Sequence, residues 1–172
     1  KMSLLVSLIV NFLSAVLSYY LIQDLILKNI KIPDFLEFFN SYGLMSVVLL
    51  LFYLKNRYQI FLFEGVILLV FLLYYLRSYN AARKKFHEKF KAMILSFGYT
   101  REGYFDVFLS KKLLIRGVES FFFGLGVYYM FDSFFRQFLM QSNLHTIVFC
   151  SILFAAAAQV KNNKGLKIYK NN

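Results

Sequence analysis

The chain has 172 residues, of which 59% are hydrophobic, and 20 Lys and Arg against 9 Asp and Glu give it a net charge of +11. Soluble domains are about 45–50% apolar by a narrower count, and the mean hydropathy here is +0.56, so the composition excludes a single water-soluble core. Cys150 is the only cysteine, which excludes a disulfide framework or a CxxC metal site within this chain.

The first expected helix covers residues 2–27, an apolar run broken only by small polar residues until Gln23 and Asp24. The run exceeds the apolar part of a signal peptide, so we interpret it as a retained membrane helix. One face carries polar residues at helical steps, which we call the polar seam: Ser3, Ser7, Asn11, Ser14 and Ser18. Because lipid does not favour hydroxyls and amides in hydrocarbon, the polar seam predicts a helix–helix contact or, alternatively, the wall of a pore.

A short link over residues 28–42 leads to a second apolar run at 43–54, which is shorter than the roughly 20 residues that cross a bilayer. We favour five membrane helices, in which 43–54 crosses and the N-terminus lies outside. If 43–54 is re-entrant or lies on the surface, four spans remain and the N-terminus lies inside. Glu64 lies in the third apolar run and has no partner in its own helix. Because an unpaired charge inside a membrane is costly, we predict that Glu64 belongs to an ion or proton site or to a contact between helices.

The third helix is expected over 59–97, with its last part outside the membrane. Residues 79–97 contain no helix breaker, Gly98 suits a helix C-cap, and Thr100 suits the next N-cap. We therefore predict a cytoplasmic helical hairpin in which roughly 18 residues reach about 27 Å beyond the bilayer. The alternative is a basic helix that lies flat on anionic headgroups. The predicted partner or lipid surface consists of Arg83, Lys84, Lys85, Phe86, Lys89, Phe90 and Lys91.

The positive charge is concentrated in two segments. Residues 77–116 hold ten Lys or Arg and three acids, and the tail 161–172 holds four Lys and no acid, so together they account for the whole net charge. Lys and Arg collect in cytoplasmic loops of membrane proteins, which predicts that both segments share the cytoplasmic side. Nucleic-acid binding is the less favoured explanation, because membrane insertion alone accounts for the basicity.

The fourth and fifth helices are expected over 101–140 and 144–160. Both carry small residues at spacings that allow close helix contact, within the chain or between chains: Gly117, Ser120 and Gly124, then Ser151, Ala155 and Ala158. The fourth helix also carries two charged pairs that can neutralise locally: Arg116 with Glu119, and Asp132 with Arg136. We expect these pairs to anchor the two ends of the fourth span.

No spacing of residues indicates catalysis. Neither His87 nor His145 has a Cys, Asp or Glu at a metal-ligand spacing, so we expect no catalytic residue, cofactor or metal. The sequence thus predicts one all-α membrane domain over 1–172 that acts as a non-catalytic subunit. It would form a homo-oligomer, or anchor or signal to a cytoplasmic partner within a larger complex, of respiratory, secretion or anti-phage type. The alternatives are a small ion or solute channel lined by the polar seam and, less favoured, a membrane-embedded enzyme.

The residue bias also bears on the membrane concerned. The chain is rich in Phe, Tyr, Ile, Asn and Lys and has no Trp, which is typical of AT-rich genes. We therefore expect a bacterial cytoplasmic membrane, with the mitochondrial inner membrane as the alternative.

Overall fold

The computed structural model is all-helical over the residues that it describes, which confirms the predicted class. Those residues are 2–28, 30, 32–58, 62–98, 100–138, 147–156 and 158–159. Side chains are described for all of them except 2–4, 56–58, 85–95, 101–102 and 137–138. The lysine-rich tail, His145 and the side chain of His87 therefore lie outside the described part.

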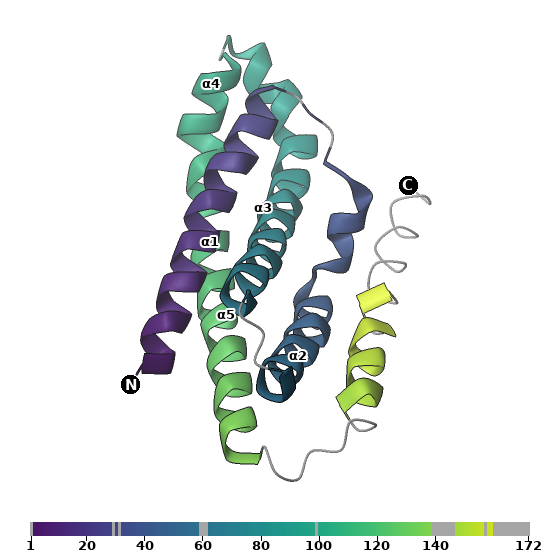
Figure 1. Cartoon of the computed structure of the whole chain (residues 1–172). Helices are drawn as coiled ribbons and strands as arrows, with labels where there is room; N and C mark the ends of the chain where they lie inside the picture. The colour runs from purple at the N-terminus through teal and green to yellow at the C-terminus, as the bar shows by residue number, and fades with distance from the viewer. Residues whose placement is uncertain are drawn as a thin grey trace.

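Three long helices lie side by side and form the core (Figure 1). They are α1 (Met2–Leu27), α3 (Phe63–Ser96) and α5 (Ser110–Phe138). Within the described residues, three segments are long and apolar enough to cross a membrane: Leu5–Leu27, Phe63–Lys84 and Phe105–Arg136. These helices fit contact with a lipid bilayer, because many large apolar side chains on α1 and α5 point outward and remain exposed.

The second apolar run forms α2 (Ser41–Tyr58), which is 18 residues long and therefore longer than the expected run at 43–54. Asn40 caps it, since its Oδ1 accepts hydrogen bonds from the backbone N–H groups of Tyr42 (3.0 Å) and Gly43 (3.2 Å). A 3₁₀ turn, η1 (Asp34–Phe38), precedes it. A Cβ at Gly43 would lie 1.9 Å from the backbone oxygen of Phe38, so only glycine lets η1 fold this closely onto α2.

The apolar helix Ile147–Ala156 packs against α2, as Figure 1 shows. The Ser46 hydroxyl donates to the Ser151 carbonyl oxygen at 2.9 Å, and the Asn40 amide donates to the Ala158 carbonyl oxygen at 3.2 Å. Ser151 and Ala158 are both buried. The small residues of this last helix are therefore used in a contact within the chain.

α3 is one continuous helix that extends 12 residues beyond its membrane-length segment. Gly98 follows it in the left-handed conformation, with φ +85, as expected for a glycine that ends a helix. The Thr100 hydroxyl then accepts a hydrogen bond from the Gly103 N–H and starts the next helix. That helix begins as α4 (Arg101–Tyr104), widens through the π-helical turn η2 (Phe105–Leu109), and continues as α5.

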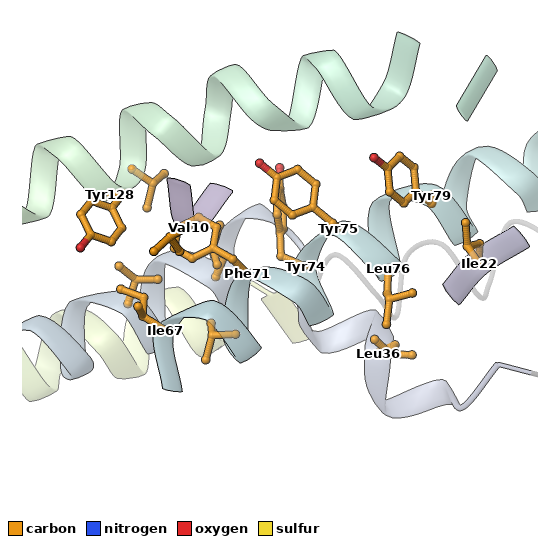
Figure 2. Packing of buried hydrophobic residues seen from close by; sticks show 14 of the residues in the cluster. Val10, Ile22, Leu36, Ile67, Phe71, Tyr74, Tyr75, Leu76, Tyr79 and Tyr128 are labelled. Atoms are coloured by element: carbon orange, nitrogen blue, oxygen red, sulfur yellow. The ribbon is translucent and has the colours of Figure 1, made fainter. Parts of the chain in front are cut away.

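The core between the long helices is largely aromatic. Tyr75, Phe71 and Tyr128 are almost fully buried, with Tyr75 and Phe71 on α3 and Tyr128 on α5. Figure 2 shows the Tyr75 and Tyr79 rings pointing from α3 toward α5. Large rings in this layer require small residues on the facing helix, and α5 supplies them at Gly117 and Gly124.

Candidate functional site

The polar seam of α1 lies inside the chain, against α3. The Ser14 hydroxyl donates to the Leu68 carbonyl oxygen at 3.1 Å, and the Ser18 hydroxyl donates to the Leu72 carbonyl oxygen at 2.9 Å. Both serines are fully buried. Because a small hydroxyl side chain lets two backbones approach and supplies a hydrogen bond, this is the helix-contact geometry that the serine spacing suggested.

Asn11 forms the centre of the seam. Its amide donates to the Ser7 carbonyl oxygen at 2.9 Å, and its Oδ1 accepts the Tyr75 hydroxyl at 3.0 Å. A Cβ at Gly124 would lie 2.3 Å from the same Oδ1. Ser7 and Asn11 are buried, so the described part of the seam faces protein; the Ser3 side chain lies outside the described residues.

A second polar contact joins α3 to α5. The Ser78 and Ser120 hydroxyls are 2.6 Å apart, and the Arg116 Nε donates to the Ser78 hydroxyl at 3.1 Å. Arg116 also pairs with Glu119, whose side chain remains 65% exposed. A Cβ at Gly117 would lie 2.7 Å from the Tyr79 hydroxyl oxygen. The small-residue stripe of α5 therefore serves the contact with α3.

The depth of this contact differs from the expected position at the end of a span. The Tyr79 hydroxyl, which touches Gly117, also donates to the Ala15 carbonyl oxygen at 3.3 Å. Ala15 lies at the middle of the apolar segment Leu5–Leu27. Arg116 and Glu119 are therefore level with the centre of the most apolar helix. The depth of Arg116 and Glu119 follows from the residues of α1 and α3 that lie beside Gly117. The spacing of residues along α5 does not reveal it.

The other pair of α5 lies far from that level. The Arg136 Nε is 2.9 Å from the Asp132 Oδ2, and the Asp132 side chain is 8% exposed whereas that of Arg136 is 63% exposed. Asp132 is 15 residues beyond Gly117 along α5, which corresponds to about 22 Å of helical rise. This pair fits an anchor near the end of the helix.

Glu64 has a partner from another helix. It lies in the first turn of α3, where the helix dipole favours a carboxylate, and the Lys55 Nζ of α2 is 3.3 Å from its Oε1. The same ammonium group lies 4.1 Å from the centroid of the Phe63 ring. Glu64 is more than half exposed, so its surroundings are those of a helix end paired with α2.

Toward the opposite end of the membrane-length segment of α3, Glu37 of η1 binds two cations. Its carboxylate oxygens lie 3.3 Å from the Arg77 Nε and 2.8 Å from the Lys84 Nζ. This cluster attaches the link before α2 to the middle of α3.

The predicted basic surface is described only in part. The Arg83 side chain is partly exposed and that of Lys84 is exposed, and Lys111 and Lys112 are exposed near the start of α5. Phe97, at the tip, is 71% exposed. The remaining members of the surface lie on α3, but their side chains are outside the described residues: Lys85, Phe86, Lys89, Phe90 and Lys91.

Sequence reasoning missed the part that α3 plays in these contacts. Tyr75 and Tyr79 supply the hydroxyls that reach α1, and Ser78 joins Arg116 to Ser120. In the sequence, Tyr75, Ser78 and Tyr79 are residues with a terminal hydroxyl inside an apolar segment. The same pattern occurs where aromatic side chains only fill a core, so it did not indicate hydrogen bonds between helices. The partners of these hydroxyls come from α1 and α5, so only the packing of the helices reveals them.

The chemistry available at these sites is that of packing and charge pairing. Within the described ranges, no group of three His, Cys, Asp or Glu residues lies close enough to hold a metal ion. No family model, curated protein or solved structure matches the chain. The functional conclusion below therefore depends on the geometry of this chain.

Proposed function

We propose that the chain is a non-catalytic, multi-pass membrane subunit that anchors a cytoplasmic partner through its basic hairpin and assembles with other chains in the bilayer. The observation that carries the proposal is the continuity of α3. It extends as one helix from the segment Phe63–Lys84 to Ser96, and α4 packs back against it. A helix pair holds its exposed Lys and Phe residues in fixed positions, which suits a docking surface.

The proposed topology has five membrane helices. The two ends of the η1–α2 segment pair with α3 at widely separated levels, through Glu37 with Lys84 and through Lys55 with Glu64. Residues 64 and 84 are about 30 Å apart by helical rise, which is the thickness of the hydrocarbon core. We infer that η1 and α2 cross together, which places the N-terminus outside and the hairpin and tail in the cytoplasm.

The channel alternative receives less support. It was motivated by the polar seam, and the described members of the seam are buried against protein. The side chains of Asn11, Ser14 and Ser18 form hydrogen bonds with α3 or within α1. A pore wall would need these groups to face water. Liposome flux that is lost in Asn11→Leu would restore this alternative.

The test is charge reversal of the hairpin in the full-length chain. Lys85, Lys89 and Lys91 are changed to Glu, and the matched control changes three tail lysines, Lys161, Lys164 and Lys167, to Glu. A partner that co-purifies from native membranes in fixed stoichiometry is expected to be lost from the hairpin variant and retained by the tail variant. Absence of any stoichiometric partner, or equal retention by both variants, would refute anchoring through the hairpin. Binding of the hairpin to anionic vesicles alone would replace the protein partner with lipid.

A further inference from the structure

The outward face of α5 carries a stripe that the contacts with α1 and α3 do not use. Its members recur at steps of four, three, four and three residues, and we call them the outer stripe: Ile115, Glu119, Phe122, Gly126 and Tyr129. All five are exposed, and the Phe122 side chain reaches 69%. This repeat of 3.5 residues is the spacing by which one helix packs along another at a shallow angle.

The outer stripe includes a charge that is level with the middle of the apolar segment of α1. Glu119 is two residues from Gly117, or about 3 Å along the helix, and Gly117 is level with Ala15 at the middle of the α1 span. Its side chain is 65% exposed although it pairs with Arg116. Ionisable groups within the hydrocarbon layer almost always face protein or water rather than lipid. The position of Glu119 therefore indicates that protein covers this face.

Gly126 is a second and independent indication. Of the α5 glycines, Gly117 and Gly124 are filled from inside by α3 and α1 side chains, whereas a Cβ at Gly126 would meet nothing within 4 Å. Gly126 is exposed, and it lies seven residues, or two turns, beyond Glu119 on the same stripe. A glycine that is open on the outer face of a membrane helix allows the backbone of another helix to approach.

We infer that a second copy of this chain packs along the outer stripe, with the two α5 helices parallel about a two-fold axis normal to the membrane. The charges favour a second copy because Arg116 and Glu119 make the face self-complementary. Each Glu119 is already paired with Arg116 of its own chain, so two identical faces can meet at the axis with no net charge. The inference deepens the assembly part of the proposed function and rests on it, while anchoring through the hairpin is measured separately.

Cysteine cross-linking in native membranes tests the contact directly. In a Cys150→Ser background, Gly126→Cys is compared with Phe12→Cys, which places the thiol on the exposed outer face of α1. A bifunctional thiol reagent is expected to convert the Gly126→Cys chain to a dimer and to leave the Phe12→Cys chain monomeric. Equal cross-linking at both positions, or none at Gly126→Cys, would overturn the inference. A cross-link from Gly126→Cys to a protein of different mass would overturn the assignment to a second copy.

A pair of glycine variants tests the same surface without chemistry on thiols. Gly126→Leu places a large side chain on the outer stripe. Gly65→Leu places the same side chain at an exposed position on α3, where a Cβ also meets nothing within 4 Å. Both chains have room to fold as monomers. The dimer dissociation constant in nanodiscs is expected to rise at least about tenfold for Gly126→Leu and to stay within about threefold for Gly65→Leu. Equal effects would contradict the inference. Hairpin charge reversal should leave dimerisation unchanged, which separates the two proposals.

Discussion

The contact of Gly124 with Asn11 offers a quantitative test of how α5 packs against α1. In Gly124→Ala, the new Cβ would lie 2.3 Å from the Asn11 Oδ1 and 3.1 Å from the Tyr75 hydroxyl oxygen. Asn11 cannot simply move, because its amide binds the Ser7 carbonyl oxygen and its Oδ1 accepts the Tyr75 hydroxyl. We therefore expect α5 to move away from α1 and the Tyr75–Asn11 hydrogen bond to weaken.

The magnitude follows from three contributions. Overpacking of a tight contact costs about 1–3 kcal/mol, and loss of a hydrogen bond inside a membrane protein costs about 0.6 kcal/mol. Alanine gains about 1 kcal/mol of helix propensity over glycine. The matched control is Gly126→Ala, on the same helix, where the Cβ meets nothing within 4 Å. Because the propensity gain is common to both variants, Gly124→Ala should be less stable than Gly126→Ala by about 1.5–3.5 kcal/mol.

The assay is equilibrium unfolding in mixed detergent micelles at one chain per micelle. A Gly124→Ala chain as stable as Gly126→Ala would refute the close contact between α1 and α5. The double variant Asn11→Ala, Gly124→Ala adds a second criterion, because removal of the amide makes room for the new methyl group. We expect the cost of Gly124→Ala to fall by about 1 kcal/mol in that background; simple additivity would argue that the two residues do not touch.

Three further outcomes are expected from the remaining contacts. Asn40→Ala should destabilise the chain by about 1 kcal/mol in the same unfolding assay, because α2 loses its N-cap; an unchanged stability would contradict the cap. Glu37→Gln keeps the size of the side chain but removes the carboxylate that pairs with Arg77 and Lys84. Glu37→Gln should therefore destabilise the chain by about 1 kcal/mol in the same assay, and an unchanged stability would contradict the pairing of Glu37 with Arg77 and Lys84. Ser18→Ala should cost less than about 1 kcal/mol, because it removes one hydrogen bond to α3, whereas Ser18→Leu should cost more by forcing the two helices apart.

The helical class follows from the sequence for simple physical reasons. Apolar runs of membrane length must satisfy their backbone hydrogen bonds internally, so they form helices whatever surrounds them. The first helix, its polar seam and the glycine that ends α3 at Gly98 were all accessible from local pattern. Local signals suffice there because caps and helix faces depend on residues within a few turns.

Residue pairs that join two different helices could not be predicted from local sequence patterns. Glu64 lacks a partner in its own helix, and only the packing of α2 brings Lys55 to it. The Tyr75 hydroxyl reaches Asn11 across 64 positions of sequence because Gly124 leaves room for both. Such contacts depend on the relative rotation and offset of helices, which no residue spacing within one helix encodes.

The sequence by itself determined that this chain is all-helical, with helices long and apolar enough to cross a membrane and with its positive charge concentrated in two segments of the sequence. It did so because hydropathy and charge act on each segment independently. Tertiary structure alone decided which polar residues face inward and at what depth the charges lie. The seam of α1 is buried against α3, whereas Glu119 remains on the outer face of α5 level with the middle of α1. That difference sets internal packing apart from the surface where we propose that a second copy binds.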